Sequence, residues 1–400
     1  MRKKELGIYI HIPFCKQKCN YCDFISYTNK CDKIENYIDC LEKEINNFDF
    51  SKYNVTTIYI GGGTPSFIES KYIKQLMNII YKKIEVEKKI RNDIEITIEV
   101  NPGTITRKKL QDYKDVGINR LSIGLQSVQD KLLKQLGRIH TYEEFLETYQ
   151  LAKEIGFENI NVDLMLGLPN QTIEDLKESM NKVIELNPNH ISIYSLIVEE
   201  ETKICNQIKN NELQMPDEEL ERNMYWYVKN TLELKGYSHY EISNFSKKGK
   251  ESKHNINCWN QEEYIGFGVA AHSYIKNVRF SNTNNLEEYI KNINSGKFEN
   301  NKNIEEEQTI EDKEKEFMML GFRKINGVDI SKFKEKFVNN PIFLYKDKLN
   351  KLVEEGLIEI DLNSIKLTNK GIDLANLVFE EFIWNKNSYK PPLAWTFNMF

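Results

Sequence analysis

Three cysteines near the N-terminus are the residues of this chain best suited to chemistry. They stand in the segment His11-Ile-Pro-Phe-Cys15-Lys-Gln-Lys-Cys19-Asn-Tyr-Cys22, directly after a strand-like run. Thiolates are soft ligands that select iron–sulfur clusters or zinc. Three thiolates on one short loop can hold three irons of a cubane cluster, which leaves the fourth iron open for a chelating ligand. The spacing therefore favours an iron–sulfur site.

Two other interpretations of these cysteines stay open at this point. A structural zinc site needs a fourth ligand, and Cys31, Cys40 or His11 could supply it, but none has a usual zinc-finger spacing. The thiols could also be buried without any metal, since free cysteine is commonly buried. The chain has seven cysteines, an odd number, and a charged start that is not a signal peptide. This pattern predicts a reducing, cytoplasmic location.

A second set of polar and glycine residues lies beside the cysteines or at the ends of strand-like runs. Glycine lets a backbone approach a ligand closely, and buried charges need partners. A bound polar ligand would supply such partners, whereas the structural alternative is that the glycines form plain turns and the charged residues form salt bridges that only stabilise the fold. The candidates are Tyr9, Tyr21, Gly61, Gly62, Gly63, Thr64, Glu99, Gln126, Arg138 and Asp163.

Six strand-like runs alternate with helix-length amphipathic stretches in the first half of the chain. An apolar run suits a strand buried on both faces of a parallel sheet. Six such units predict an α/β fold, either an open doubly wound sheet or a barrel, with ligands at the carboxyl ends of the strands. The runs are Gly7–Pro13, Val55–Gly61, Ile94–Val100, Asn119–Leu125, Asn161–Leu166 and His190–Leu196, and the helical stretches include Lys33–Asn47, Lys71–Lys82, Tyr142–Ile155 and Thr172–Glu185.

The Cys-x3-Cys-x2-Cys pattern after the first strand resembles the radical S-adenosylmethionine (SAM) family. The resemblance implies a partial (β/α)6 barrel that holds one [4Fe–4S] cluster through Cys15, Cys19 and Cys22. In that family the amino and carboxylate groups of SAM chelate the open iron. One electron from the reduced cluster then cleaves SAM to methionine and a 5′-deoxyadenosyl radical, so an electron donor is an implied partner.

Further segments resemble the oxygen-independent coproporphyrinogen III oxidase-related family within that class. They run in order over residues 7–200, and the resemblance continues to about residue 384. The segments are Tyr9-Ile-His-Ile-Pro-Phe-Cys15, Gly61-Gly-Gly-Thr64-Pro65, Ile98-Glu99-Val-Asn-Pro, Arg120-Leu-Ser-Ile-Gly-Leu-Gln126-Ser, Gly137-Arg138 and Asp163-Leu-Met-Leu-Gly-Leu-Pro169.

Two departures resemble the HemW-type haem chaperones of that family rather than the dehydrogenase. The dehydrogenase carries a long N-terminal arm and an extra cysteine at the second position after its third ligand. Here 14 residues precede Cys15, and Asp23-Phe24 follow Cys22. The resemblance implies a protein that binds haem and delivers it to an acceptor protein. Oxidative decarboxylation of coproporphyrinogen III is the alternative, and a different radical reaction, such as methyl transfer, is a third.

The resemblance also assigns roles to single residues. Glu99 and Asp163 match positions suited to ribose or sulfonium contacts, Arg138 matches a SAM carboxylate contact, and the Gly61–Thr64 turn matches a SAM amino contact. The segment His254-Asn-Ile-Asn-Cys258-Trp259 matches the His-Asn-x-x-Tyr-Trp motif of the chaperones except at Cys258. His254, Cys258 and, less directly, His272 are therefore the predicted haem contacts, because histidine and thiolate are both good axial ligands.

The alternation of strand-like and helix-like segments does not continue into the second half of the chain, which divides into further regions. After a radical SAM core over residues 1–205 we expect a middle region over 206–308, with a long helix at Asp217–Lys235, a loop-rich part at Gly236–Ser281 and a solvated linker at Asn294–Gln308. Helices followed by a short hairpin over residues 309–384 resemble a winged-helix domain. Residues 385–400 have no helical periodicity and no assigned function.

Charge and hydropathy limit the partners. Residues 328–384 carry eight lysines and no arginine against ten acidic residues, so a nucleic-acid partner is not expected. The whole chain has a net charge of −5, which points to no polyanion either. No run of about 18 apolar residues exists, so no transmembrane segment is expected. Peripheral contact with a membrane stays open.

Overall fold

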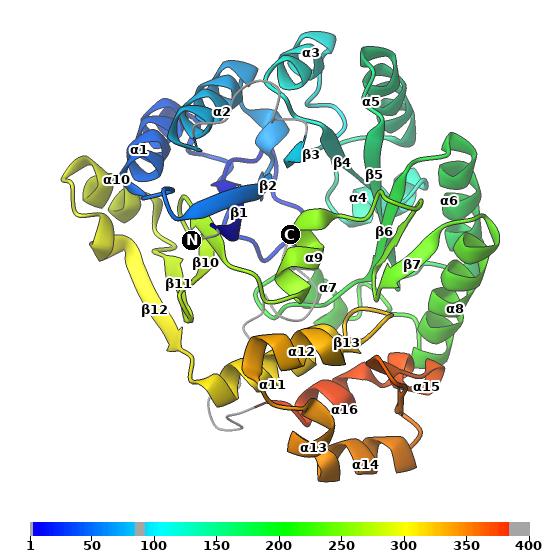
Figure 1. Ribbon diagram of the computed structural model, residues 1–400. Helices are drawn as coiled ribbons and strands as arrows, with labels where there is room; N and C mark the ends of the chain where they lie inside the picture. Colours follow the sequence, from blue (N-terminus) through cyan, green and yellow to red (C-terminus); the bar gives the residue numbers. More distant parts are fainter. Residues whose placement is uncertain (1–2, 85–92, 384–400) are drawn as a thin grey trace.

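The computed structural model describes residues 3–84 and 93–383. Its centre is a curved sheet in which six parallel strands are connected by helices on the outer face (Figure 1). The strands are β1 (Lys4–Ile12), β2 (Tyr53–Gly62), β3 (Glu95–Val100), β4 (Arg120–Gln126), β5 (Asn159–Leu166) and β6 (His190–Ser195). The main connecting helices are α1 (Ile34–Asn47), α2 (Ser70–Ile84), α3 (Arg107–Asp115), α5 (Tyr142–Ile155) and α6 (Ile173–Leu186). The six predicted units are confirmed.

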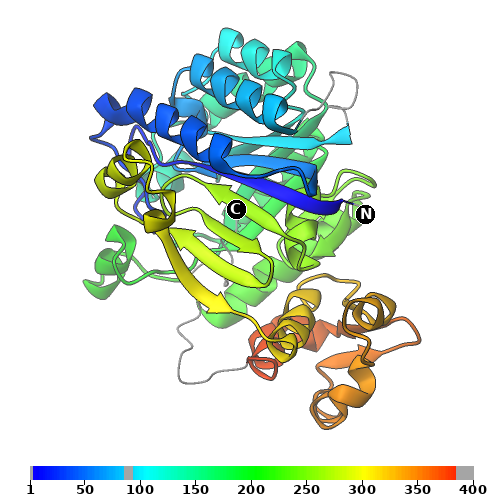
Figure 2. The same cartoon turned by 60° about the vertical axis from the view of Figure 1, so that its left-hand side comes forward.

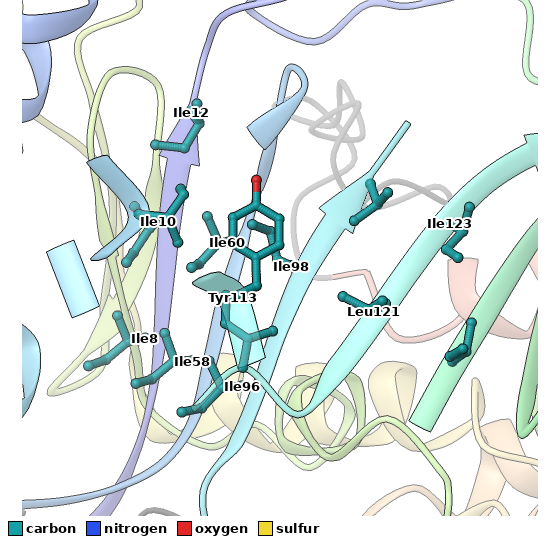
Figure 3. Packing of buried hydrophobic residues seen from close by; sticks show 14 of the residues in the cluster. Ile8, Ile10, Ile12, Ile58, Ile60, Ile96, Ile98, Tyr113, Leu121 and Ile123 are labelled. Atoms are coloured by element: carbon teal, nitrogen blue, oxygen red, sulfur yellow. The ribbon is translucent and has the colours of Figure 1, made fainter. Parts of the chain in front are cut away.

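Alternate residues of these strands form the apolar core between sheet and helices. Figure 3 shows their isoleucine and leucine side chains in rows beside Tyr113 of α3. The labelled strand residues are Ile8, Ile10, Ile12, Ile58, Ile60, Ile96, Ile98, Leu121 and Ile123. The intervening residues of β3 to β6 are mostly polar, and many of them are also buried. Both faces are thus buried, as expected, but the inner face is polar because it lines a cavity.

The middle region extends this sheet at both edges instead of forming loops. The observed strand order is β12-β11-β10-β9-β1-β2-β3-β4-β5-β6-β8-β7, so the sheet stays open and the barrel is partial. The added strands are β7 (Ser238–Glu241), β8 (Asn244–Ser246), β9 (Tyr264–Phe267), β10 (His272–Ile275), β11 (Val278–Asn282) and β12 (Lys302–Glu307). The short helix α9 (Lys253–Trp259) lies between these edges (Figure 1). The loop-rich interpretation of Gly236–Ser281 was wrong.

The predicted linker at Asn294–Gln308 was also wrong. Its second half is strand β12, which pairs antiparallel with β11 at the edge of the sheet. Before it come the end of α10 (Leu286–Asn294) and a 3-10 turn, η4 (Phe298–Asn301). The polar composition predicted a linker, but an edge strand is held by hydrogen bonds of its backbone, so its side chains can be polar. Charged side chains on such a strand also hinder unwanted pairing with another chain.

The remaining elements form a small C-terminal domain with its own core. They are α11 (Ile310–Gly321), β13 (Val328–Asp329), α12 (Ile330–Phe337), α13 (Pro341–Leu344), α14 (Lys346–Glu354), β14 (Ile358–Ile360), β15 (Ser364–Leu367), α15 (Asn369–Asp373) and α16 (Ala375–Glu380). The sheet order is β13-β15-β14, which fits the predicted winged-helix-like arrangement. Figures 1 and 2 show these elements together on one side of the barrel. Residues 385–400 lie outside the described residues.

The long helix expected at Asp217–Lys235 is α8 (Glu218–Leu234). The other elements are α4 (Asp130–Gln135), α7 (Lys203–Lys209) and the 3-10 turns η1 (Cys31–Lys33) and η2 (Pro65–Phe67). Among the helices of the described part, none is long and apolar enough to cross a membrane.

Candidate functional site

The cysteine loop leaves the carboxyl end of β1 and is held at several points. The amide of Cys15 donates to the carbonyl of Tyr27 at 3.0 Å, and the amide of Tyr27 donates to the carbonyl of Pro13 at 2.7 Å. Farther along the loop, the amide of Asn20 donates to the carbonyl of Leu136 at 2.8 Å. Cys15 is buried, whereas Cys19 and Cys22 are partly exposed. The loop therefore presents three thiols from a backbone fixed against two other segments.

A cavity at the mouth of the barrel brings the cysteines together with most of the predicted ligand residues. All three cysteines line it. The other predicted residues in its lining are Tyr21, Gly62, Gly63, Thr64, Glu99, Gln126, Arg138 and Asp163. These side chains come from five strand ends and the loops that follow them, which is where a parallel α/β barrel places its ligands.

The glycine turn after β2 packs directly on the cysteine loop. A Cβ atom on Gly63 would lie 3.0 Å from the Sγ of Cys15, so only glycine fits this approach. Gly62 has φ +110°, a conformation that favours glycine. The hydroxyl of Thr64 lies 3.5 Å from the Sγ of Cys15 and donates to it. The turn thus positions one thiol and leaves no room for a side chain between them.

Two half-buried carboxyl groups, Glu99 of β3 and Asp163 of β5, line the cavity. Burial, and secondarily the negative charge of Asp163, raises the pKa of Glu99 to about 8. Glu99 accepts hydrogen bonds from the Tyr59 hydroxyl at 3.1 Å and the Gly62 amide at 3.1 Å. Burial also raises the pKa of Asp163, which accepts from Asn161 Nδ2 at 2.7 Å. A ligand that carries positive charge or donates hydroxyls would stabilise both groups in their ionised form.

Arg138 connects the cysteine loop to the end of β4. Its Nη1 lies 3.7 Å from the Sγ of Cys19, and its Nη2 donates to Asn101 Oδ1 at 2.8 Å and to the carbonyl of Gly124 at 2.7 Å. Gln126 follows in a positive-φ conformation, φ +70°, and accepts from the Tyr194 hydroxyl at 3.2 Å. Both side chains line the cavity, beside the thiols.

The thiols suit a cluster better than a single ion. No group of three histidine, cysteine, aspartate or glutamate side chains within residues 3–84 and 93–383 is placed to hold one metal ion. A cubane presents its irons at separate corners, so its ligands need not converge on one point. Burial, and secondarily the nearby Cys19, raises the pKa of Cys22 to about 12. Iron would relieve this cost, since it binds the deprotonated thiolate.

Two of the predicted SAM residues, Gly61 and Tyr9, do not line the cavity. Tyr9 lies in the middle of β1, where its ring stacks on Tyr59 and its hydroxyl is 3.0 Å from the Nδ1 of His11. Tyr59 itself lines the cavity, together with Asn101 and Tyr194. The sequence interpretation missed these three. The period of two along each strand could have indicated Tyr59, because it stands two residues before Gly61 on the same face.

The histidine motif anchors α9 to the barrel. His254 is buried, its Nδ1 lies 2.7 Å from the hydroxyl of Thr57, and its amide donates to the carboxylate of Glu95. Cys258 is buried beside Tyr264 and Tyr274. Neither residue lines the cavity, whereas Asn255 and Trp259 of the same helix do. His272 is partly exposed on β10 and pairs with Glu305.

Comparisons with known proteins agree with this geometry. A family model described as the radical SAM superfamily matches residues 9–183, and one described as the HemN C-terminal domain matches residues 309–374. A Bacillus subtilis protein named heme chaperone HemW is 39% identical over 377 residues, which cover 94% of this chain and 98% of that protein. The Escherichia coli protein of the same name is 37% identical over 68% of this chain and 70% of its own length.

A solved structure of coproporphyrinogen III oxidase (HemN) from Escherichia coli, described as a radical SAM enzyme, has a similar fold. Its TM-score is 0.83 at 25% identity, over 95% of this chain and 90% of that one. The resemblance to relatives of the first name is greater in sequence and equally complete in length. This chain belongs to the HemW family of radical SAM proteins.

Proposed function

We propose that this chain binds a [4Fe–4S] cluster through Cys15, Cys19 and Cys22, binds SAM beside the cluster, and carries haem to acceptor proteins. The observation that carries the proposal is the convergence of three thiols from one fixed loop on a polar cavity at the barrel mouth. When bound, the cluster would supply one electron and an iron with an open coordination position.

The residues around the thiols suit the groups of SAM. Glu99 and Asp163 would accept from ribose hydroxyls and stabilise the sulfonium charge. Arg138 would pair with the carboxylate, and the backbone of the Gly62–Thr64 turn would contact the amino group. Tyr21 and Gln126 line the same space and would exclude water and orient the ligand. Tyr9 would act through Tyr59, on which its ring stacks.

Haem carriage is favoured over porphyrinogen chemistry by the relatives. Five proteins named heme chaperone HemW match at 33–39% identity over 94–96% of this chain. The alternative, oxygen-independent dehydrogenation of coproporphyrinogen III, is supported by the fold shared with HemN. Fold alone is the weaker argument, because one fold hosts many functions.

His254 and Cys258 stay predicted haem contacts. Both are buried residues of α9, His254 against Thr57 of β2 and Cys258 against Tyr264 and Tyr274, so a contact with haem would require α9 to move away from the sheet. We also propose a cytoplasmic location, an electron donor for the cluster and an acceptor protein for haem.

Haem titration of the cluster-loaded protein tests the proposal against its alternative. We expect a Soret band that saturates with added haem, and no conversion of coproporphyrinogen III under reducing, anaerobic conditions with SAM. Conversion without haem binding would instead establish the dehydrogenase. An unchanged haem spectrum and affinity in His254→Ala would remove His254 from the haem contacts.

A further inference from the structure

The cavity continues beyond the thiols to a deep end that the cluster and SAM residues do not explain. Five of the residues that line this part are Arg120, Glu241, Asn244, Trp259 and Arg323. They come from the beginning of β4, from β7 and β8, from α9 and from the turn after α11. The deep end is thus built partly by the barrel and partly by the C-terminal domain.

Arg120 is the unusual member of this group. It is only 2% exposed, it lines the cavity, and its Nε has no hydrogen-bond partner among the described residues. Arg120 stands four positions before Gly124, whose carbonyl accepts from Arg138, so Arg120 begins β4 roughly 13 Å deeper along the strand. It is therefore a different cation from the one beside the thiols.

The nearby carboxylates Asp163 and Glu241 are attracted by Arg120 and Arg323, respectively, but their hydrogen bonds come from other donors. Asp163 accepts from Asn161 and Ser122, and Glu241 accepts from Asn244. A second cation, Arg323, reaches the cavity from the C-terminal domain, and its guanidinium lies 4.3 Å from the centre of the Trp259 ring. A guanidinium offers five N–H donors in a planar fork that matches a carboxylate. Arg120 is such a fork, it is buried, and its Nε has no acceptor among the described residues, which indicates an acceptor group that is supplied by a ligand.

We propose that the deep end of the cavity is a subsite for the carboxylate group of a bound small molecule, with Arg120 as its first cation and Arg323 as its second. Two sources of a carboxylate fit the protein. One is a propionate of haem, and this source rests on the function proposed above. The other is a free α-amino acid such as methionine, which SAM cleavage would release. Bidentate pairing with Arg120 would fix the orientation of either ligand.

The first test uses free propionate, the acid group of a haem side chain, so that the result does not depend on haem binding. Propionate would be titrated into the cluster-loaded protein by calorimetry, with propionamide as the neutral control. We expect propionate to bind, propionamide not to bind, and Arg120→Gln to weaken propionate at least about tenfold. Arg120→Lys keeps the positive charge but lacks the planar guanidinium, so its affinity for propionate should lie between those of the wild type and Arg120→Gln. Arg107→Gln, which removes an exposed arginine paired with Glu154, should change nothing.

Iron content and SAM affinity of each variant report whether the fold is intact. If Arg120→Gln does not fold, the comparison of Arg120→Lys with the wild type decides, since lysine cannot form the bidentate pair. Equal propionate binding in the wild type and the folded variants, or no binding to the wild type, would overturn the proposal and leave Arg120 as a hydrated structural group.

The second test separates the sources. Haem would be compared with its dimethyl ester, and methionine with methioninamide, on the wild type and Arg120→Gln. A preference for free haem that disappears in the variant identifies a propionate, and a preference for methionine that disappears identifies the amino acid. Failure of haem to bind at all would contradict the proposed function, while the propionate result would still decide the subsite.

Discussion

Cys15, Cys19 and Cys22 lie on one loop, and burial makes the thiolate form of Cys15 and Cys22 unfavourable in the absence of iron. Burial raises the pKa of Cys15 as well as that of Cys22, so iron must displace protons from both. We expect any single cysteine-to-alanine change on the loop to prevent a normal four-iron cluster. Iron analysis and the absorption spectrum after anaerobic reconstitution measure this.

The exposed Cys31 supplies the matched control for these variants. Cys31→Ala should load as much iron as the wild type. A full cluster in the triple alanine variant would show that the loop does not hold it.

Glu99 predicts a pH dependence of stability in the ligand-free protein. Its folded pKa of about 8 lies above the ordinary value of 4.5, so the folded state holds a proton that the unfolded state has lost. The contribution to stability is therefore fully present below about pH 4.5 and is lost as the pH rises through about 8. Its size is of order a few kcal/mol.

Denaturant unfolding from pH 5 to 9 measures this loss. Glu99→Gln cannot ionise, so its unfolding free energy should fall less steeply with pH than that of the wild type. Glu158→Gln changes an exposed carboxylate and should follow the wild-type curve. Parallel curves for Glu99→Gln and the wild type would show that Glu99 does not titrate in this range.

Among single residues, the sequence predicted those whose role depends on neighbours along the chain. It missed residues that reach the site through the pairing of distant strands. The spacing of the cysteines and the glycine turn needed no knowledge of the fold. Tyr194 joins the site only because β6 brings it to the inner face, and no local signal marks it, whereas the period of two along β2 could have indicated Tyr59. His254 was predicted from its match to the motif of the chaperones, but its burial on α9 depends on contacts with Thr57 and Glu95, which are distant in sequence.

At the scale of elements, the glycine turn after β2 is the part that fits most tightly against the cysteine loop. A methyl group on Gly63 would meet Cys15 Sγ, the carbonyl of Ile12 and the amide of Phe14, each at 3.0 Å. Two of these are backbone atoms that cannot turn away. We expect Gly63→Ala to reduce iron loading several-fold in reconstitution.

Gly296→Ala is the control for this change. Gly296 has φ +70° and open space around its Cβ position, so alanine there costs about 1 kcal/mol of stability without touching the site. If both variants load iron equally well, the contact between the turn and the loop does not position Cys15.

Helix starts and buried strands were predictable, whereas edge strands were not. Thr172 and Asp175 form the expected capping box of α6, since a cap needs only residues three apart. Strand β12 contains Lys302 and three glutamates, a composition that predicts a solvent-exposed linker rather than a strand. Its structure comes from pairing with β11, which composition cannot show.

For the whole molecule, a buried ion pair joins the barrel sheet to the C-terminal domain. Arg279 of β11 lies 2.8 Å from Glu316 of α11, with side chains 8% and 0% exposed. Removing one partner leaves a buried charge, so Arg279→Met should destabilise the protein by about 3 to 5 kcal/mol. Thermal or denaturant unfolding measures this.

The double variant Arg279→Met with Glu316→Leu separates charge from packing. It removes both charges and should recover much of the loss. A single variant as stable as the wild type would show that the pair does not hold the two domains together.

The proposed function requires that the protein carries haem while it holds its cluster. A transfer assay tests this: the cluster-bound protein is loaded with haem and mixed with an apo-haem protein, and the Soret bands of donor and acceptor are followed. We expect the acceptor band to grow as the donor band falls, faster than from free haem under the same conditions. A protein with a full cluster that neither binds haem nor speeds its transfer would not be a haem carrier.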